Sequence, residues 1–297
     1  MSNPAKENDA QILDGGPRMN IMFSAPDFTV PSPDSVNEMV TNDNTIFHWG
    51  GVRIARISPE MVVKFGSHVT LAEAKNMMFV KQNTETLPVP NVFAYYTYGP
   101  IDRDVLDYGS LFDTYMFMSY VEGQSLDKAW ETYDEETKFH VTNQLKGYIR
   151  ELRSIPSGNY IGSADSGPVT DPILEAYHNK GPFDSEEAVN NTLIAAYQSK
   201  VPRSHVKTFL SGMLSQNTHQ IVFTHGDLHH PNTMVKDGVV SGIVDWEFSG
   251  WYPEYWEFIK ALYIWQWQND WFDYLVQILR PYYAEYGAHS FLAGILW

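Results

Sequence analysis

An α+β fold in two lobes is predicted by the spacing of apolar residues along the chain. Before Gly123 they form short runs rich in valine and isoleucine that end at turn residues, which is typical of antiparallel strands. After Gly123 they recur at helical spacing, and one Asp237-Gly238 pair marks a hairpin. We therefore expect a flexible leader at residues 1–40, a small antiparallel-sheet lobe at residues 41–122 and a larger, mainly helical lobe at residues 123–297.

The leader and the first lobe are assigned from proline, glycine and β-branched residues. Residues 1–40 are polar and contain several prolines and Gly15-Gly16, so only one short helix, from Ser35, is expected there. A longer helix begins at Thr70, where Thr70 and Glu73 form a capping-box pattern. The strands of this lobe are expected at residues 45–49, 52–57, 61–65, 92–97 and 115–120.

The second lobe is assigned from amphipathic periodicity. Helices are expected at residues 134–153, 186–197 and 203–214, and one or two more at residues 256–280. A short strand is expected at residues 221–224 and a hairpin at residues 232–246. Six of the nine tryptophans lie between Trp246 and Trp271, so the last part of this lobe should be unusually aromatic.

The charge and the absence of cysteine exclude several classes of protein. The 297 residues include 36 acids and 20 bases, a net charge of −16, and no cysteine. Disulfide frameworks and cysteine-ligated metal sites are excluded, and so negative a chain should bind neither nucleic acid nor an anionic membrane. The charge is compatible with a cationic small substrate, or simply with solubility. Acid clusters at residues 102–113 and 131–136 are expected to be solvated surface.

Targeting and membrane segments are not recognisable. The N-terminus lacks the basic and apolar regions of a signal peptide, and no run of 18 apolar residues is present. We therefore expect a cytoplasmic protein with no membrane span.

The segment that carries chemistry contains His225-Gly-Asp227, Asn232 and Asp245. Asp227 follows a short strand, and Asn232 opens the hairpin. The returning strand of the hairpin should bring Asp245 close to Asn232, so three oxygen-bearing side chains converge. Oxygen ligands suit Mg²⁺, and two ligands with one proton acceptor are what phosphoryl transfer requires.

A second candidate lies in the first lobe. Lys64 interrupts a β-branched run, and a lysine on an inner sheet face is costly unless it is paired. Glu73 in the following helix is the available partner. The alternative is that Glu73 serves the capping box and leaves Lys64 alone.

These motifs resemble the aminoglycoside phosphotransferase and choline kinase family of small-molecule kinases, and most closely its fungal-type members. The resemblance spans residues 45–285 and implies a protein kinase-like bilobal fold. The motifs that carry it are H-G-D-L-x-x-x-N from His225, I-V-D-W-E from Ile243, Leu87-Pro-Val-Pro-Asn91-Val, Met118-Ser-Tyr-Val121-Glu-Gly123, Gly181-Pro-Phe183 and Gly250-Trp-Tyr-Pro-Glu254-Tyr-Trp.

The resemblance implies ATP and Mg²⁺ as cofactors and a role for each matched residue. Asp227 would be the catalytic aspartate, and His225 would brace its loop. His229 and His230 are adjacent, so a histidine metal site is disfavoured. The remaining implied roles are Mg²⁺ binding by Asn232 and Asp245, phosphate binding by Lys64 fixed by Glu73, adenine binding by the backbone at Ser119 and Val121, and a phosphate loop at Gly50-Gly51.

The acceptor is expected against the aromatic C-terminal helices. Acids beside aromatic rings suit an ammonium group. The candidates are Glu254, Asp270, Trp267 and Trp271. The alternative is that the aromatic residues are core and that a neighbouring acid, Glu257, only braces a loop.

The sequence therefore predicts a kinase that moves the γ-phosphoryl group of ATP to a hydroxyl of a small molecule, with cationic and aromatic compounds as the candidate acceptors. There are two alternatives. One is a nucleotide-binding pseudokinase or scaffold, and the other is a kinase-fold enzyme with altered chemistry in a natural-product pathway. The acceptor itself and any protein partner are not specified by the sequence.

Overall fold

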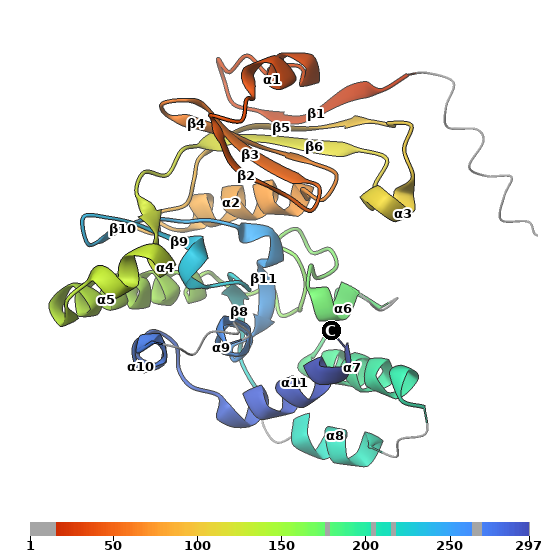
Figure 1. Ribbon diagram of the computed structural model, residues 1–297. Helices are drawn as coiled ribbons and strands as arrows, with labels where there is room; N and C mark the ends of the chain where they lie inside the picture. Colours follow the sequence, from red (N-terminus) through yellow and green to blue (C-terminus); the bar gives the residue numbers. More distant parts are fainter. Residues whose placement is uncertain (1–15, 176–178, 203–205, 215–217, 263–268, 297) are drawn as a thin grey trace, which may run out of the picture. The chain divides into compact units, whose positions relative to one another are not determined.

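The chain forms two compact units, shown in the computed structural model of Figure 1. The structure describes residues 16–175, 179–202, 206–214, 218–262 and 269–296. Unit 1 comprises Met1–Ala74 and Pro90–Tyr120, and unit 2 comprises Lys75–Val89 and Val121–Trp297. Unit 1 is built on an antiparallel sheet and unit 2 is mainly helical, so the predicted α+β class is confirmed.

One six-stranded sheet forms the framework of unit 1. Its strand order is β1-β5-β6-β4-β3-β2, and all neighbours are antiparallel. The strands are β1 (Arg18–Ser24), β2 (Thr45–Trp49), β3 (Val52–Ser58), β4 (Met61–Gly66), β5 (Val92–Gly99) and β6 (Asp113–Ser119). Two short helices, α1 (Pro33–Met39) and α3 (Val105–Tyr108), belong to the same unit.

The expectation of a flexible leader is wrong for residues 18–39. β1 pairs with β5 from Arg18 opposite Gly99 to Ser24 opposite Ala94. α1 begins at Pro33, two residues before the expected start, and Ser32 caps it by accepting a hydrogen bond from the Ser35 amide. Because β1 is an edge strand whose side chains are mostly exposed, its backbone pairing leaves little apolar pattern in the sequence. Residues 1–15 of the leader lie outside the described residues.

The two faces of the sheet in unit 1 have different roles. Val63, Phe65 and Phe117 belong to a core cluster that also contains Val36 of α1. Side chains alternate along a strand, so Lys64, between Val63 and Phe65, points to the opposite face. The packing of β4 therefore determines the direction of the lysine.

Helix α2 (Leu71–Asn83) crosses the boundary between the units in the sequence. Residues 75–89 group with unit 2, although they were expected in the lobe at residues 41–122. Asn76 donates to the carbonyls of Trp246 and Ser249, and Phe79 packs on the rings of Phe223 and Trp251. These contacts to distant residues are invisible in the local sequence.

Unit 2 contains the predicted helices and hairpin. The expected hairpin is confirmed, and both of its turn residues, Asp237 and Gly238, have positive φ. Its helices are α4 (Leu126–Ala129), α5 (Glu135–Arg153), α6 (Pro172–Glu175), α7 (Glu186–Lys200), α8 (Lys207–Leu214), α9 (Trp256–Ala261), α10 (Trp271–Ile278) and α11 (Tyr283–Leu296). Its strands are β7 (Gln124–Ser125), β8 (Ile221–Thr224), β9 (Thr233–Lys236), β10 (Val239–Ile243) and β11 (Gly250–Pro253).

Two small sheets hold the chemistry-bearing segment of unit 2. β10, β9 and β7 form one sheet, and β8 pairs with β11 in the other. The segment between β8 and β9 is thus fixed at both ends by strand pairing. Among the described helices, none is both long and apolar enough to cross a bilayer.

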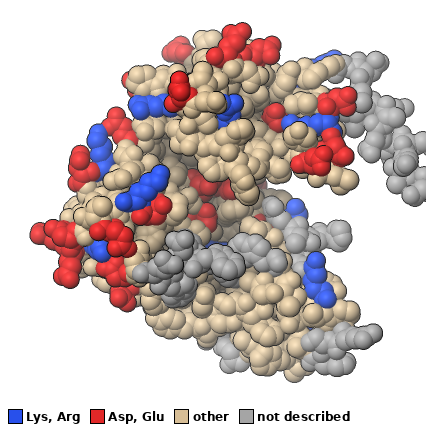
Figure 2. Space-filling view, in the orientation of Figure 1, with Lys and Arg blue, Asp and Glu red and all other residues tan. Residues whose placement is uncertain are grey.

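Acidic side chains make up much of the charged surface on the face shown in Figure 2. Among the acids of the predicted surface cluster at residues 131–136, Glu131, Asp134, Glu135 and Glu136 lie at or just before the start of α5 and are exposed. This acid cluster is therefore solvated surface, as expected, whereas Asp113 of the other predicted cluster is half-buried and paired with Arg103.

Candidate active site

The loop after β8 is held by a buried carboxylate from α9. Glu257, which is 1% exposed, accepts hydrogen bonds from the amides of His225 and Gly226, at 2.7 and 3.1 Å. Buried backbone amides that are not hydrogen-bonded within a sheet or helix need an acceptor of this kind. The interpretation of Glu257 as a loop brace is therefore confirmed.

Gly226 is required by the backbone of this loop. Its φ is +82°, and a Cβ at this position would lie 2.5 Å from the Phe248 carbonyl oxygen. Only glycine combines this conformation with so close an approach. The glycine of the H-G-D motif thus allows the loop to pass directly beside the segment that follows β10.

His225 ties the loop to the end of the hairpin. Its Nε2 donates to the Val244 carbonyl at 3.0 Å, and its Nδ1 accepts from the Asp227 amide at 3.2 Å. The ring is fully buried and packs edge-on against Trp246. With both nitrogens occupied by backbone groups, His225 is a brace, as expected.

The Asp227 carboxylate has a donor on each oxygen. Asn232 Nδ2 donates to Oδ2 at 2.6 Å and also to the Asp227 carbonyl at 3.0 Å. His229 Nδ1 lies 2.9 Å from Oδ1. Burial opposes ionisation, but the hydrogen bond and charge of His229 and the hydrogen bond from the Asn232 amide outweigh it and lower the pKa of Asp227. At neutral pH Asp227 is therefore an ionised, oriented carboxylate.

His229 makes a second hydrogen bond on its other side. Its Nε2 donates to the Lys260 carbonyl at 2.9 Å. Burial tends to lower the pKa of His229, but the hydrogen bond and charge of Asp227 and the Lys260 carbonyl raise it overall. Local sequence patterns do not reveal this contact, because Lys260 lies in a helix 31 residues further along the chain.

Asn232 and Asp245 are brought together by the hairpin. The Val244 amide donates to the Asn232 carbonyl at 2.9 Å, and Asp245 follows immediately with a φ of +66°. Aspartate is among the few residues that tolerate this left-handed conformation. Because the Asn232 amide nitrogen faces Asp227, its oxygen is the atom that Asn232 can offer to a cation. A carboxylate and an amide oxygen form a donor set that fits Mg²⁺.

In unit 1, Lys64 and Glu73 form a buried ion pair. Lys64 Nζ lies 2.7 Å from Glu73 Oε2, and the side chains are 7% and 1% exposed. The capping-box alternative is not supported, because Thr70 Oγ1 has no hydrogen-bond partner within the described ranges. The predicted pairing of Lys64 with Glu73 is confirmed.

The remaining predicted nucleotide residues have clear local roles. Gly50 and Gly51, with φ of +59° and +76°, form the turn between β2 and β3, and a Cβ on Gly51 would lie 2.2 Å from His68 Nδ1. Ser119 exchanges hydrogen bonds with Asn91, through both its amide and its hydroxyl. Val121 begins unit 2, and its side chain occupies the space where a Cβ at Gly242 would lie. No ligand contact is needed to explain these placements, so their nucleotide roles stay predictions.

The expected acceptor residues are mostly engaged within unit 2. Asp270 accepts from Lys138 Nζ at 2.9 Å and from Trp130 Nε1 at 2.8 Å, so its charge is already paired. Trp271 is buried against Trp130, which supports the alternative of a core residue. Glu254 is half-buried and lies close to the Tyr282 hydroxyl. The pKa of Tyr282 is raised, first by burial and then by Glu254. Trp267 lies outside the described residues.

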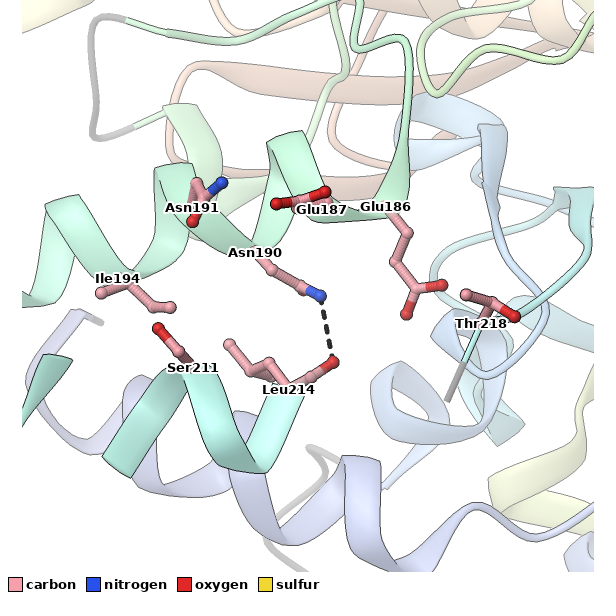
Figure 3. A pocket seen from close by; sticks show the side chains of 8 residues that line it. All are labelled: Glu186, Glu187, Asn190, Asn191, Ile194, Ser211, Leu214 and Thr218. Carbon is pink, nitrogen blue, oxygen red and sulfur yellow. Dashed lines mark hydrogen bonds between the residues drawn. The ribbon is translucent and has the colours of Figure 1, made fainter. Parts of the chain in front are cut away.

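A separate cavity of about 470 Å³ lies between α7 and α8 (Figure 3). None of the predicted site residues lines it. Two of its polar side chains are used within the protein, because Glu186 accepts from His219 and Asn190 donates to the Leu214 carbonyl. We assign it no part in the chemistry.

Comparisons with known proteins identify the family and the fold of the chain. The model of the phosphotransferase enzyme family matches residues 39–292. A thermostable mutant of the aminoglycoside phosphotransferase APH(4)-Ia, in a ternary complex with ADP and hygromycin B, has a TM-score of 0.55 and 11% identity, over 84% of this chain and 85% of that one. ADP-bound APH(2'')-Ib has a TM-score of 0.51 and 10% identity, over 84% and 80%. These identities indicate a shared fold. No curated protein matches the chain.

Proposed function

The chain belongs to the phosphotransferase enzyme family, and on this premise we propose that it transfers the γ-phosphoryl group of ATP, with Mg²⁺, to a hydroxyl of a small molecule. The observation that carries the proposal is the Asp227 carboxylate. It is ionised, has a donor on each oxygen, and lies on a loop braced by Glu257. A fixed carboxylate of this kind suits the acceptance of a proton from an attacking hydroxyl.

Asp227 acts on the acceptor in this proposal. One of its oxygens receives a hydrogen bond from the acceptor hydroxyl and orients it. The same oxygen takes the proton as the new P–O bond forms and the bond from the γ-phosphorus to the bridging oxygen of ATP breaks, so that ADP leaves. His229 and Asn232 keep the carboxylate from rotating. Catalysis then rests mainly on positioning, which can account for a large part of the barrier reduction in a reaction between two bound groups.

Asn232 and Asp245 hold the metal in this proposal. Bound Mg²⁺ would neutralise charge on the phosphate oxygens. Asn232 presents its amide oxygen because its nitrogen is hydrogen-bonded to Asp227. Asp245 is held in place by the buried Trp246 beside it, whose Nε1 donates to the Ile243 carbonyl. The residues therefore fit the ion through the chemistry of their donor atoms.

Lys64 binds the α- and β-phosphate oxygens in this proposal. Glu73 orients its ammonium group and offsets the cost of burying it. Nucleotide binding is supported by the fold, since the two solved structures of this fold described above contain ADP. The acceptor is proposed only as a small hydroxyl compound. One of those structures contains hygromycin B, but such low identity does not carry an acceptor from one protein to another.

Product analysis tests the proposal. The purified chain is incubated with ATP and Mg²⁺ and a panel of amino alcohols, sugars and aminoglycosides, and products are identified by mass spectrometry. We expect ADP release with a gain of one phosphate on the acceptor, abolished in Asp227→Ala and retained in a matched control, Asp184→Ala, at an exposed position. Nucleotide binding without any turnover would favour the scaffold alternative. A product without added phosphate would favour altered chemistry.

A further inference from the structure

His229 joins the proposed catalytic carboxylate to helix α9. Its Nδ1 lies 2.9 Å from Asp227 Oδ1, and its Nε2 lies 2.9 Å from the Lys260 carbonyl oxygen. A carboxylate and a carbonyl can only accept hydrogen bonds, so both ring nitrogens are donors. The ring therefore has no lone pair left for a metal, which agrees with the rejection of a histidine metal site.

Helix α9 is a firm support for this ring. The Lys260 carbonyl belongs to the last turn of α9, where the cap amide of Leu262 also approaches it and a second lone pair of the oxygen can accept from His229. The Lys260 ammonium forms a buried ion pair with Asp171 at 2.6 Å. The same helix carries Glu257, which holds the amides of His225 and Gly226. One helix thus supports both the start of the loop and, through His229, the end of the Asp227 side chain.

The two oxygens of Asp227 are held from different places. Oδ2 is held by Asn232, which belongs to the segment leading into β9. Oδ1 is held by His229 and so by α9. A hydrogen-bond donor on each of its two oxygens defines the plane of a carboxylate. With a donor on one oxygen only, the carboxylate can rotate about the hydrogen bond that remains. Removal of the His229 contact would therefore change orientation without removing the base.

We propose that His229 is a positioning residue that sets the plane of the Asp227 carboxylate for its reaction with the acceptor hydroxyl. This inference rests on the proposed function. It predicts an effect on the chemical step and little effect on nucleotide binding, because His229 contacts the proton acceptor and α9.

Two substitutions separate the two hydrogen bonds of the ring. In His229→Asn the amide nitrogen takes the place of Nδ1, so the donor to Asp227 is kept and the bond to Lys260 is lost. In His229→Gln the amide nitrogen takes the place of Nε2, so the bond to Lys260 is kept and the donor to Asp227 is lost. His230→Phe is the matched control, because the His230 ring packs on Trp271 at 4.0 Å and the phenyl ring preserves that packing.

The readouts are kcat and the KM for each substrate, together with the thermal midpoint of the full chain. We expect His229→Gln to lower kcat about 10²-fold, the scale of a small misplacement, with an almost unchanged nucleotide KM. His229→Asn should recover most of that loss, and His230→Phe should match the wild type. Equal losses in the Asn and Gln variants, or a Gln variant with wild-type kcat, would overturn the proposal.

A measurement that needs no turnover separates this inference from the proposed function. In protein labelled with ¹⁵N-histidine, NMR should show protons on both ring nitrogens of His229 at neutral pH. The Nδ1 proton should become exchange-labile in Asp227→Ala, while the Nε2 proton stays protected. If the wild type transfers no phosphate but these signals are present, the proposed function fails and the contact stands. If the Nδ1 signal does not respond to Asp227→Ala, the positioning role is wrong.

Discussion

In unit 1 the Lys64 ammonium is held by regular secondary structure, whereas in unit 2 the Asp227 carboxylate is held by an irregular loop. Lys64 lies on β4, and its partner Glu73 lies in the first turn of α2. Asp227 follows a glycine with positive φ and depends on Glu257 and His225 for the shape of its loop. The Lys64 ammonium needs only a partner of opposite charge. The Asp227 carboxylate must also have a defined orientation, so its backbone has to be fixed as well.

This difference also predicts which property a substitution in each unit should impair first. Loss of either partner in unit 1 leaves a buried charge, which is a problem of stability first. Loss of a brace in unit 2 lets the carboxylate move, which is a problem of rate first. The substitutions below test this contrast from the largest expected effect on stability to the smallest.

The largest effect is expected from Lys64→Met. It leaves Glu73 buried without its lysine, and breaking a buried pair costs about 3–5 kcal/mol. The double variant Lys64→Met/Glu73→Leu removes both charges and should regain most of the unfolding free energy, but not nucleotide binding. Urea unfolding and calorimetric titration with ATP measure the two quantities. A double variant as unstable as the single one would contradict the ion-pair account.

Gly226→Ala should be next. The left-handed conformation alone costs an alanine ~1–2 kcal/mol, and the clash with the Phe248 carbonyl adds to that cost. The turnover rate should fall by more than the decrease in the folded fraction of the variant explains. The control is Gly147→Ala, an exposed position in α5 where a Cβ meets nothing within 4 Å. That control should gain roughly 0.5–1 kcal/mol. Equal behaviour of the two variants in urea unfolding would refute the requirement for glycine.

Glu257→Gln tests the brace on the same loop. A glutamine has one oxygen where the carboxylate has two, so one of the two amides of His225 and Gly226 loses its acceptor. An unsatisfied buried donor costs about 1–3 kcal/mol. We expect kcat to drop while the ATP affinity remains, measured by steady-state kinetics and titration. Glu187→Gln, at an exposed position of α7, is the matched control. A wild-type kcat in Glu257→Gln would show that Glu257 is not needed to position the loop that carries Asp227.

The smallest effect at neutral pH is expected at His289, a buried ionisable side chain of unit 2 whose contribution appears only as the pH falls. Burial, helped by the charge of Lys260, lowers the pKa of His289 from 6.5 to about 3. The unfolded chain therefore takes up a proton below pH 6.5 that the folded chain takes up only near pH 3. The unfolding free energy should decline as the pH falls through this window, by up to ~1.4 kcal/mol per pH unit for one proton. His289→Leu should flatten the profile by that amount, and parallel profiles would show that His289 does not titrate this way.

Regular elements and local motifs were predictable from the sequence. The strand period placed Lys64 on one face, and the Asp-Gly turn placed Asn232 beside the residue before Asp245. The partners that come from distant elements were not. Lys138, which neutralises Asp270, lies on another helix 132 positions away, so Asp270 looked like a free acid. The edge strand β1 was missed for a related reason, since its pairing uses backbone groups that no side-chain pattern reports.

ATP affinity and turnover measured on the same two variants test the central claim most directly. Asp227→Asn keeps the size of the side chain but not the proton acceptor, and Lys64→Met/Glu73→Leu keeps unit 1 folded without its ammonium group. The account predicts that the first variant binds Mg-ATP like the wild type and transfers no phosphate, and that the second loses affinity for ATP. Turnover at the wild-type rate in Asp227→Asn, or unchanged ATP affinity in the double variant, would contradict it.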